Sequence, residues 1–311
     1  MSTPALERVD HSAPEHSFKT RARTGGDSGL MTIPDGKPHV NGGAEATEGS
    51  ILPLDDGDMY VCQDGPRDAP PLLLIHGSAA STRSWDSLVP LLTESHRVIR
   101  IDLLGCGRSA APADGGYGPP EQGRRVGAAL DRLGVEHAVI VGHSAGGLVA
   151  TALAEQRPDL VTALVLINTG PGMDAFIATE TAAIGPSEWP PTDEQIRQFG
   201  STAFSREGFQ FPQDFVDEVR AMPYHAFAAA MQAPRDYLRQ RVLPERLAVL
   251  GKPLQVIFGD HDRRWRPSSA ADYRAVPDAR VEMLSGVGHT PILEDPTRTA
   301  ELLLAFTAIH T

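Results

Sequence analysis

The sequence predicts an α/β fold: one mostly parallel, eight-stranded sheet with helices on both faces and an inserted helical segment. Three observations support this class. From residue 50 onward, short apolar runs of strand type alternate with segments of helical periodicity. Several of these runs are continuously apolar, which is typical of parallel strands that are buried on both faces. Between residues 169 and 252 the alternation stops for 84 residues, which indicates a long insertion within the sheet.

The first expected elements are a polar extension and a hairpin. Residues 1–49 contain only 13 apolar residues, one of them the aromatic Phe18, and four prolines. This composition predicts a flexible polar N-terminal extension outside the folded core. Ser50–Leu54 and Met59–Gln63 follow as strand-like runs, and the turn-forming residues between them predict a leading hairpin.

Six further strands are expected from short apolar runs. They are Leu72–Ile75, Val98–Ile101, Ala138–Val141, Leu164–Ile167, Leu254–Phe258 and Val281–Leu284. Helical periodicity fills the intervals between several of them. One helix face, after a cap at Ser81 and Thr82, is predicted by the spacing of Trp85, Leu88, Val89 and Leu92. The same spacing recurs at Val126, Ala129, Leu130 and Leu133.

Two more helices are predicted from their end signals. One should begin after Ser144 and must stop before Pro158, because the residue before a proline disfavours helical geometry. The other should begin at Pro296, with Asp295 as its cap.

The expected insertion, residues 169–252, is rich in large apolar side chains. Seven of the ten phenylalanines lie in it, together with Trp189, two tyrosines and three methionines. A small helical subdomain with its own core would explain this composition. The alternative is a helical cap, or lid, whose aromatic and methionine side chains line an apolar ligand pocket. The body of the fold would then comprise residues 50–168 and 253–311.

Charge and cysteine content exclude several kinds of partner. The net charge is −12 and no stretch concentrates Lys and Arg, so nucleic acid and anionic membranes are not expected to bind. No apolar run approaches the roughly 20 residues that span a bilayer. Two cysteines, Cys62 and Cys106, cannot form a disulfide framework, and no secretory signal is recognisable, so a cytoplasmic location is expected. Composition leaves open whether the protein is a monomer or a homodimer.

The run Gly142-His143-Ser144-Ala145-Gly146 has the form G-x-S-x-G, directly after an apolar strand and directly before a helix. A turn this sharp forces its middle residue into a strained backbone conformation, and only small residues two positions away let strand and helix pack. Ser144 is therefore expected to point its hydroxyl into a cleft above the start of a helix.

A serine hydroxyl becomes a good nucleophile only beside a base that a carboxylate orients. Two later strand-like runs are followed by Asp260-His261-Asp262 and by His289. These residues should lie just past the carboxyl ends of the strands, which is where catalytic groups gather in open α/β sheets. The chain order Ser144, Asp262, His289 is one of the known orders of serine triads. After another strand, the turn at His76-Gly77-Ser78-Ala79 could direct a backbone N–H at a developing oxyanion.

With these motifs the chain resembles the α/β-hydrolase superfamily over residues 50–308. The resemblance rests on His76-Gly77, the loop 100–109 (RIDLLGCGRS), the G-x-S-x-G run, Gly259–Asp262 and Gly288-His289-Thr290-Pro291. It implies Ser144 as nucleophile, His289 as base and Asp262 as the orienting acid. It also implies the backbone N–H groups of Ser78 and Ala145 as the oxyanion hole. The family places the acid three residues after the glycine, which favours Asp262 and leaves Asp260 as a turn residue.

The remaining motif residues are expected to be structural. His76 and His143 should support the two turns, together with Gly77, Gly142 and Gly146. The run around His261 lacks further ligands at usable spacing, so no metal is expected there. Gly105 and Gly107 match no phosphate-binding pattern, so no nucleotide and no other cofactor is expected.

The resemblance implies hydrolysis of an acyl compound through an acyl-enzyme at Ser144. The aromatic and methionine side chains of a cap above the serine favour a medium-sized hydrophobic ester, lactone or thioester over a small polar substrate. A serine at position 144, in the sharp turn between strand and helix (the nucleophile elbow), argues against haloalkane dehalogenases and epoxide hydrolases, which use aspartate there. The same three residues could instead hydrolyse a carbon–carbon bond, transfer or cyclise an acyl group, or carry out perhydrolysis without a cofactor. A further alternative is a non-catalytic small-molecule-binding protein of the same fold.

Overall fold

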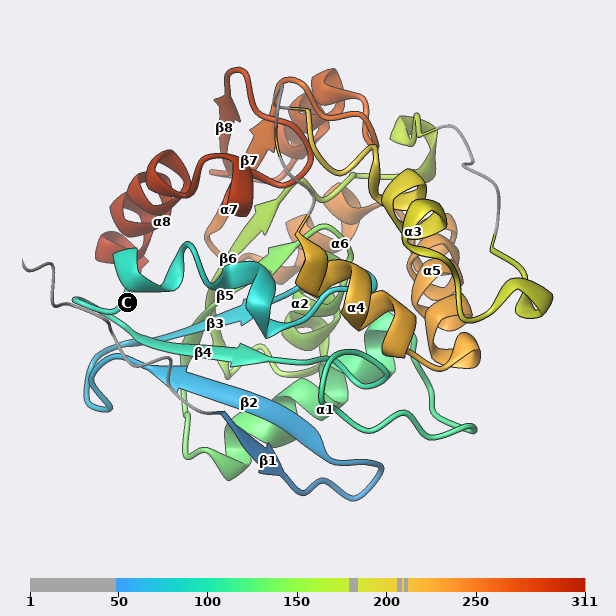
Figure 1. The fold of residues 1–311 in the computed structure, drawn as a ribbon. Helices are drawn as coiled ribbons and strands as arrows, with labels where there is room; N and C mark the ends of the chain where they lie inside the picture. The colour runs from blue at the N-terminus through green and yellow to red at the C-terminus, as the bar shows by residue number, and fades with distance from the viewer. Residues whose placement is uncertain (1–48, 179–183, 206–208, 210–211, 311) are drawn as a thin grey trace, which may run out of the picture. The chain divides into compact units, whose positions relative to one another are not determined.

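A computed structural model of the protein describes residues 49–178, 184–205, 209 and 212–310 (Figure 1). Apart from Gly49, the N-terminal extension expected at residues 1–49 lies outside the described residues. Phe211, one of the phenylalanines of the expected insertion, also lies outside them. Within the described ranges, no helix has both the length and the hydropathy needed to cross a membrane.

The described chain forms a mostly parallel sheet in the order β1-β2-β4-β3-β5-β6-β7-β8. Its strands are β1 (Ser50–Leu52), β2 (Met59–Asp64), β3 (Pro71–Ile75), β4 (Arg97–Ile101), β5 (Ala138–His143), β6 (Val161–Ile167), β7 (Leu254–Gly259) and β8 (Arg280–Leu284). The leading hairpin is antiparallel, as is the pairing of β2 with β4, and all other neighbours run parallel. The predicted sheet is confirmed.

The central strands are apolar on both faces, because each face is covered by helices. Along β5, Val139 and Val141 belong to one buried cluster, while Ala138 and Ile140 belong to the other. The α-helices are α1 (Pro119–Arg132), α2 (Ala145–Gln156), α3 (Asp193–Gly200), α4 (Gln213–Ala221), α5 (Tyr224–Gln240), α6 (Leu243–Leu250), α7 (Pro291–Glu294) and α8 (Pro296–His310). Side chains of α1, α2 and α6 pack on one face, and those of α7 and α8 pack on the other.

The predicted helix ends at Ser144, before Pro158 and at Asp295 agree with the structure. α2 starts directly after Ser144 and ends before Pro158. At the start of α8, the Asp295 carboxylate accepts a hydrogen bond from the backbone N–H of Arg298 at 3.1 Å, which is the bond that an N-cap makes.

The helix predicted around Trp85 to Leu92 is wrong in type. The segment forms two short 3-10 turns, η1 (Thr82–Trp85) and η2 (Val89–Leu91). Its apolar residues are buried as predicted, and Ser81 caps the first turn by accepting from the N–H of Arg83. Pro90 explains the difference, because it has no N–H to donate and its ring clashes with the preceding turn of an α-helix.

The chain between β6 and β7 contains α3, α4, α5 and α6, and is called here the β6–β7 segment. Leu243 and Leu247 of α6 pack into the core of the sheet. A separate cluster joins α3, α4 and the start of α5 to Ala79 and Cys106, which lie in loops after β3 and β4. In Figure 1, α3, α4 and α5 gather on the side toward which β3 and β4 point. The segment thus has a small core of its own and also contacts the loops at the carboxyl edge of the sheet.

One contact between this segment and the loop after β3 depends on pH. Glu218 of α4 accepts a hydrogen bond from the Ser81 hydroxyl at 2.7 Å, and the Arg83 guanidinium lies 3.7 Å away. Burial raises the pKa of the Glu218 carboxyl from 4.5 to about 7. The folded protein therefore holds this proton more tightly than the unfolded chain does. Its contribution to stability is complete below pH 4.5 and is lost as the pH rises through 7.

Glu218→Gln is expected to raise the free energy of unfolding by about 2 kcal/mol at pH 8, because the amide avoids burying a charge. The gain should shrink at pH 5, where the native carboxyl is protonated. Urea unfolding at both pH values measures this difference. Asp217→Asn, which changes an exposed carboxylate of the same helix that is paired with Arg220, is the control and should show no such pH dependence. An equal effect of Glu218→Gln at both pH values would contradict the prediction.

Candidate active site

Ser144 lies at the sharp turn between β5 and α2. Its backbone has φ 52° and ψ −121°, in a region that residues with a side chain rarely occupy. The turn is held at both of its backbone polar groups. The N–H of Ser144 donates to the carbonyl of Ile167 at 2.9 Å, and the Thr169 hydroxyl donates to the carbonyl of Ser144, also at 2.9 Å. These contacts from the end of β6 hold the strained conformation in place.

The glycines on either side of Ser144 are required by close backbone contacts. A Cβ atom on Gly146 would lie 2.2 Å from the carbonyl oxygen of Ile75, and one on Gly142 would lie 2.5 Å from the backbone of Gly146. Both distances are far below van der Waals contact, and neither backbone segment can move without disturbing the sheet. The small residues of the G-x-S-x-G run therefore let α2 pack directly against β3 and β5.

The structure brings Ser144, His289 and Asp262 into one hydrogen-bonded chain. His289 Nε2 lies 3.0 Å from Ser144 Oγ, and His289 Nδ1 lies 2.9 Å from Asp262 Oδ2. The side chains of His289 and Asp262 are completely buried. An ionised carboxylate can only accept, so the proton resides on Nδ1 and Nε2 is left to accept from the serine hydroxyl.

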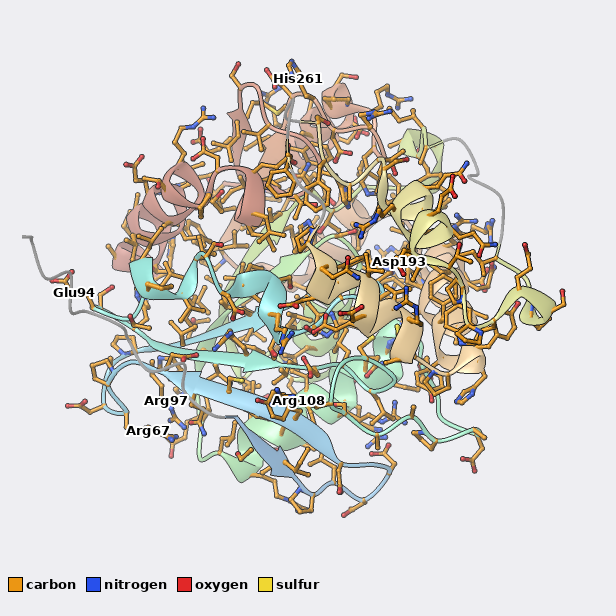
Figure 2. The ribbon with its side chains drawn as sticks, in the orientation of Figure 1. Arg67, Glu94, Arg97, Arg108, Asp193 and His261 are labelled. Carbon is orange, nitrogen blue, oxygen red and sulfur yellow. The ribbon has the colours of Figure 1, made fainter. Side chains whose placement is uncertain are left out.

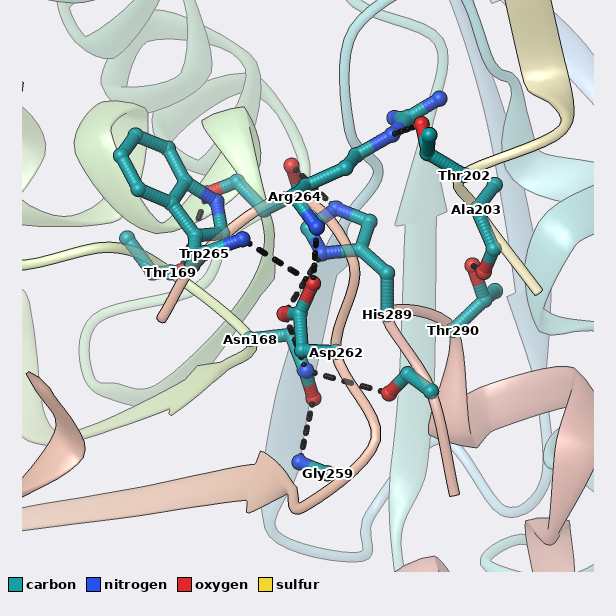
Figure 3. A network of polar contacts seen from close by, with 12 residues as sticks. Asn168, Thr169, Thr202, Ala203, Gly259, Asp262, Arg264, Trp265, His289 and Thr290 are labelled. Carbon is teal, nitrogen blue, oxygen red and sulfur yellow. Dashed lines mark hydrogen bonds and ion pairs between the residues drawn. The ribbon is translucent and has the colours of Figure 1, made fainter. Parts of the chain in front are cut away.

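Asp262 receives three further hydrogen bonds (Figure 3). Asn168 Nδ2 donates to Oδ2 at 2.7 Å, and the backbone N–H groups of Arg264 and Trp265 donate to Oδ1 at 2.7 and 3.1 Å. Burial by itself would raise the pKa of the Asp262 carboxyl. The His289 imidazole and these hydrogen bonds outweigh burial and lower the pKa below its usual value. The carboxylate is therefore ionised and fixed in orientation.

Asn168 is a site residue that the sequence analysis did not single out. It is fully buried and has φ 45°, directly after β6. Its amide nitrogen donates to Asp262 and to the carbonyl of Gly288, and its amide oxygen accepts from the N–H of Gly259. Asn168 thus joins the loop that carries Asp262 to the loop that carries His289. The available signal was a polar residue that ends an apolar strand at the carboxyl edge of the sheet.

The two backbone donors expected for an oxyanion hole both line the cavity that contains Ser144. Ala145 is the first residue of α2, so its N–H has no acceptor within the helix and projects outward from the N-terminus of α2. Ser78 follows β3, and its hydroxyl donates to the carbonyl of Ala230 in α5 at 2.9 Å. This bond connects the turn after β3 to the β6–β7 segment.

His76 and His143 stabilise the turns around Ser144. His76 Nε2 accepts from the N–H of Leu103 at 2.9 Å, so its proton lies on Nδ1, which donates to the carbonyl of Gly77. His143 Nε2 donates to the carbonyl of His289 at 2.8 Å. Burial lowers the pKa of both imidazoles, that of His143 to about 3 with a further contribution from His289, so both rings are neutral.

Asp260 and His261 lie apart from this chain of hydrogen bonds. Asp260 accepts from the backbone N–H of Gly286 at 2.7 Å, as a residue of a turn does. The side chain of His261 is 62% exposed, and Figure 2 shows it at the outer margin of the described chain. Among the described residues, no group of three His, Cys, Asp or Glu side chains is arranged to hold a metal ion.

A cavity of about 320 Å³ opens above Ser144, between the sheet and the β6–β7 segment. Its apolar lining residues include Met173, Phe176, Phe199, Phe227, Met231 and Trp265. A smaller hollow of about 50 Å³ is also lined by Ser144 and adds Phe204 and Phe215. Five of the seven phenylalanines in the expected insertion therefore face the space around Ser144.

The sequence is similar to a family model, and to known proteins over most of the part predicted to fold. A sequence model of the family described as alpha/beta hydrolase fold matches residues 70–197. A 2-hydroxymuconate semialdehyde hydrolase from Pseudomonas sp. (strain CF600) is 31% identical over 256 residues, which cover 76% of this chain and 87% of the relative. The magnesium-chelatase 30 kDa subunit of Rhodobacter capsulatus is 30% identical over 273 residues, covering 83% of this chain and 91% of the subunit.

A solved structure matches over a similar extent. The crystal structure of a hydrolase from Pseudomonas aeruginosa PA01 superimposes with a TM-score of 0.71 at 26% identity. The match covers 84% of this chain and 99% of that protein.

Proposed function

Since the chain belongs to the α/β-hydrolase family, we propose that it is a serine hydrolase that cleaves a medium-sized, largely apolar ester, lactone or thioester. The observation that carries this proposal is the hydrogen-bonded chain from Ser144 through His289 to Asp262, at the floor of an apolar cavity. In this proposal the β6–β7 segment is a cap that encloses the substrate above Ser144.

The proposed reaction begins with attack of Ser144 Oγ on the substrate carbonyl carbon, while His289 Nε2 takes the hydroxyl proton. The oxyanion accepts hydrogen bonds from the backbone N–H groups of Ser78 and Ala145, and each such donor typically lowers the barrier by about 3 kcal/mol. His289 then protonates the leaving group, which leaves an acyl-enzyme. Water attacks this ester with His289 again as base, and the acid product departs.

A second candidate function is hydrolysis of a carbon–carbon bond next to a carbonyl group by the same three residues. It is favoured by the similarity to a protein named 2-hydroxymuconate semialdehyde hydrolase, because that substrate name contains no ester. A substrate panel that includes aryl esters, thioesters and enolisable diketones separates the two candidates by their products.

The proposal predicts that a fluorophosphonate probe labels Ser144 covalently, because serines that a neighbouring base activates displace its fluoride and become phosphonylated. Peptide mapping by mass spectrometry identifies the modified residue. Ser285→Ala, which alters an exposed serine after β8, is the control and should label like the native protein. A folded protein in which Ser144 stays unmodified would rule out the proposed nucleophile.

A further inference from the structure

The cavity above Ser144 is lined by two cationic side chains. Arg235 and Arg264 both face it, and no Asp or Glu occurs among its described lining residues. The chain as a whole carries a net charge of −12. The average composition of an acidic protein does not explain a positively charged pocket. The position of the two arginines in the cavity lining therefore needs an explanation of its own.

Arg264 is held at both of its ends. Its backbone N–H donates to Asp262, and its Nε donates to the Thr202 hydroxyl at 3.1 Å (Figure 3). The guanidinium carbon lies 5.9 Å from the centre of the Phe199 ring. Arg264 lines both the main cavity and the smaller hollow, each of which also contains Ser144. The Arg264 side chain is therefore held in the lining of the same cavity as Ser144.

The positive charge of Arg264 has no ionic partner within the described part of the chain. Its two terminal nitrogens donate to no acceptor there, and the Thr202 oxygen is neutral. The nearby Asp262 carboxylate is already bonded to His289, Asn168 and two backbone N–H groups. Burial lowers the pKa of the Arg264 guanidinium, and Asp262 offsets this effect only in part. A half-buried charge without a partner is costly, so an anionic ligand would be bound favourably.

We propose that Arg264 binds a carboxylate group of the substrate, so that the substrate is an acyl compound with an apolar body and a second, anionic end. This inference rests on the proposed function and narrows its substrate class. The planar guanidinium can give two parallel hydrogen bonds to a carboxylate from its two terminal nitrogens. The aromatic and methionine residues of the cavity would cover the hydrocarbon between the carboxylate and the reacting carbonyl. Half-esters of dicarboxylic acids have this form.

The test compares mono-p-nitrophenyl adipate, which carries a free carboxylate, with p-nitrophenyl heptanoate, a neutral ester of similar length. Native protein is expected to hydrolyse the adipate half-ester with the higher kcat/KM. Arg264→Gln should lower kcat/KM for the half-ester by about tenfold to a hundredfold, as expected for loss of a charge-assisted hydrogen bond. The value for the neutral ester should change by less than about threefold, and Arg264→Lys should recover part of the preference.

Arg263→Gln is the matched control, because Arg263 is the exposed neighbour whose guanidinium, among the described residues, donates only to the carbonyl of Ser201. It should keep the native preference. An equal loss on both esters in Arg264→Gln would mean that Arg264 only braces the β6–β7 segment, and would overturn the proposal. The proposal would also be overturned if the native protein showed no preference for the half-ester over the neutral ester. The same holds if Arg235→Gln removed this preference and Arg264→Gln kept it.

Calorimetric binding to the Ser144→Ala protein separates this inference from the proposed function. Monomethyl adipate should bind more tightly than dimethyl adipate, and Arg264→Gln should remove the difference. If this binding holds while neither p-nitrophenyl ester is cleaved, hydrolysis is wrong and the carboxylate site stands. If both esters are cleaved equally and both ligands bind equally, hydrolysis stands and the carboxylate site is wrong.

Discussion

Ser144→Ala is expected to lower kcat for acyl esters by about 10⁵-fold or more, because among the described residues Ser144 is the hydroxyl bonded to His289 Nε2. The residual rate would come from substrate binding and from the donors at Ser78 and Ala145. The fold should be retained, since alanine keeps the backbone bonds to Ile167 and Thr169 and removes only Oγ. Steady-state kinetics together with a thermal unfolding curve measure both quantities.

Ser285→Ala again provides the comparison for the Ser144 variant, because Ser285 is exposed and lines neither of the two hollows that contain Ser144. Its kcat should lie within about twofold of the native value, as for most surface substitutions away from a functional site. A Ser144→Ala protein that is folded and retains more than a hundredth of the native kcat would show that Ser144 is not the nucleophile.

Asp262→Asn is expected to lower kcat by about 10⁴-fold, because the asparagine would impose the wrong tautomer on His289. Two backbone N–H groups donate to Oδ1, so the amide oxygen of asparagine must occupy that position. The amide N–H₂ group then takes the place of Oδ2 and faces His289 Nδ1. Nδ1 must then become an acceptor, and the ring proton moves to Nε2. A protonated Nε2 can no longer accept the proton of the Ser144 hydroxyl.

Asp260→Asn is the matched control for this substitution. Asp260 lies two residues away and accepts from the backbone N–H of Gly286 through Oδ1, a bond that an asparagine oxygen can keep. Its kcat should stay within about twofold of native. Equal losses in the two variants, measured at saturating substrate, would show that Asp262 has no special role in orienting His289.

Much of the fold could be predicted because its signals are local. Each central strand is a short apolar run, since both faces of a covered parallel sheet exclude water, and the ends of α2 and α8 follow from Ser144, Pro158 and Asp295. The α-helix predicted from Trp85 to Leu92 was wrong because the periodicity of the apolar residues was considered without the effect of Pro90. Burial of that face depends on the spacing of its apolar side chains, whereas the helix type depends on the missing N–H of the proline.

The site was only partly predictable, for a related reason. The residues proposed as nucleophile, base and acid each stand at the end of a strand-like run, so their positions could be read one at a time. Their supporting contacts join distant parts of the chain. Asn168 and Asp262 are 94 residues apart, and Arg264 meets Thr202 from a different segment. No local pattern predicts such pairs.

The sequence by itself determined the α/β class, the order of the strands along the chain and the elbow at Ser144. These features depend on side-chain periodicity and on glycines that no other residue can replace at such close approach. Only the tertiary structure decided which aspartate contacts His289, that Asn168 holds it, and that Arg264 faces the cavity beside Ser144. Those relations depend on how strand ends and the β6–β7 segment meet in space, and packing of the whole chain sets that geometry.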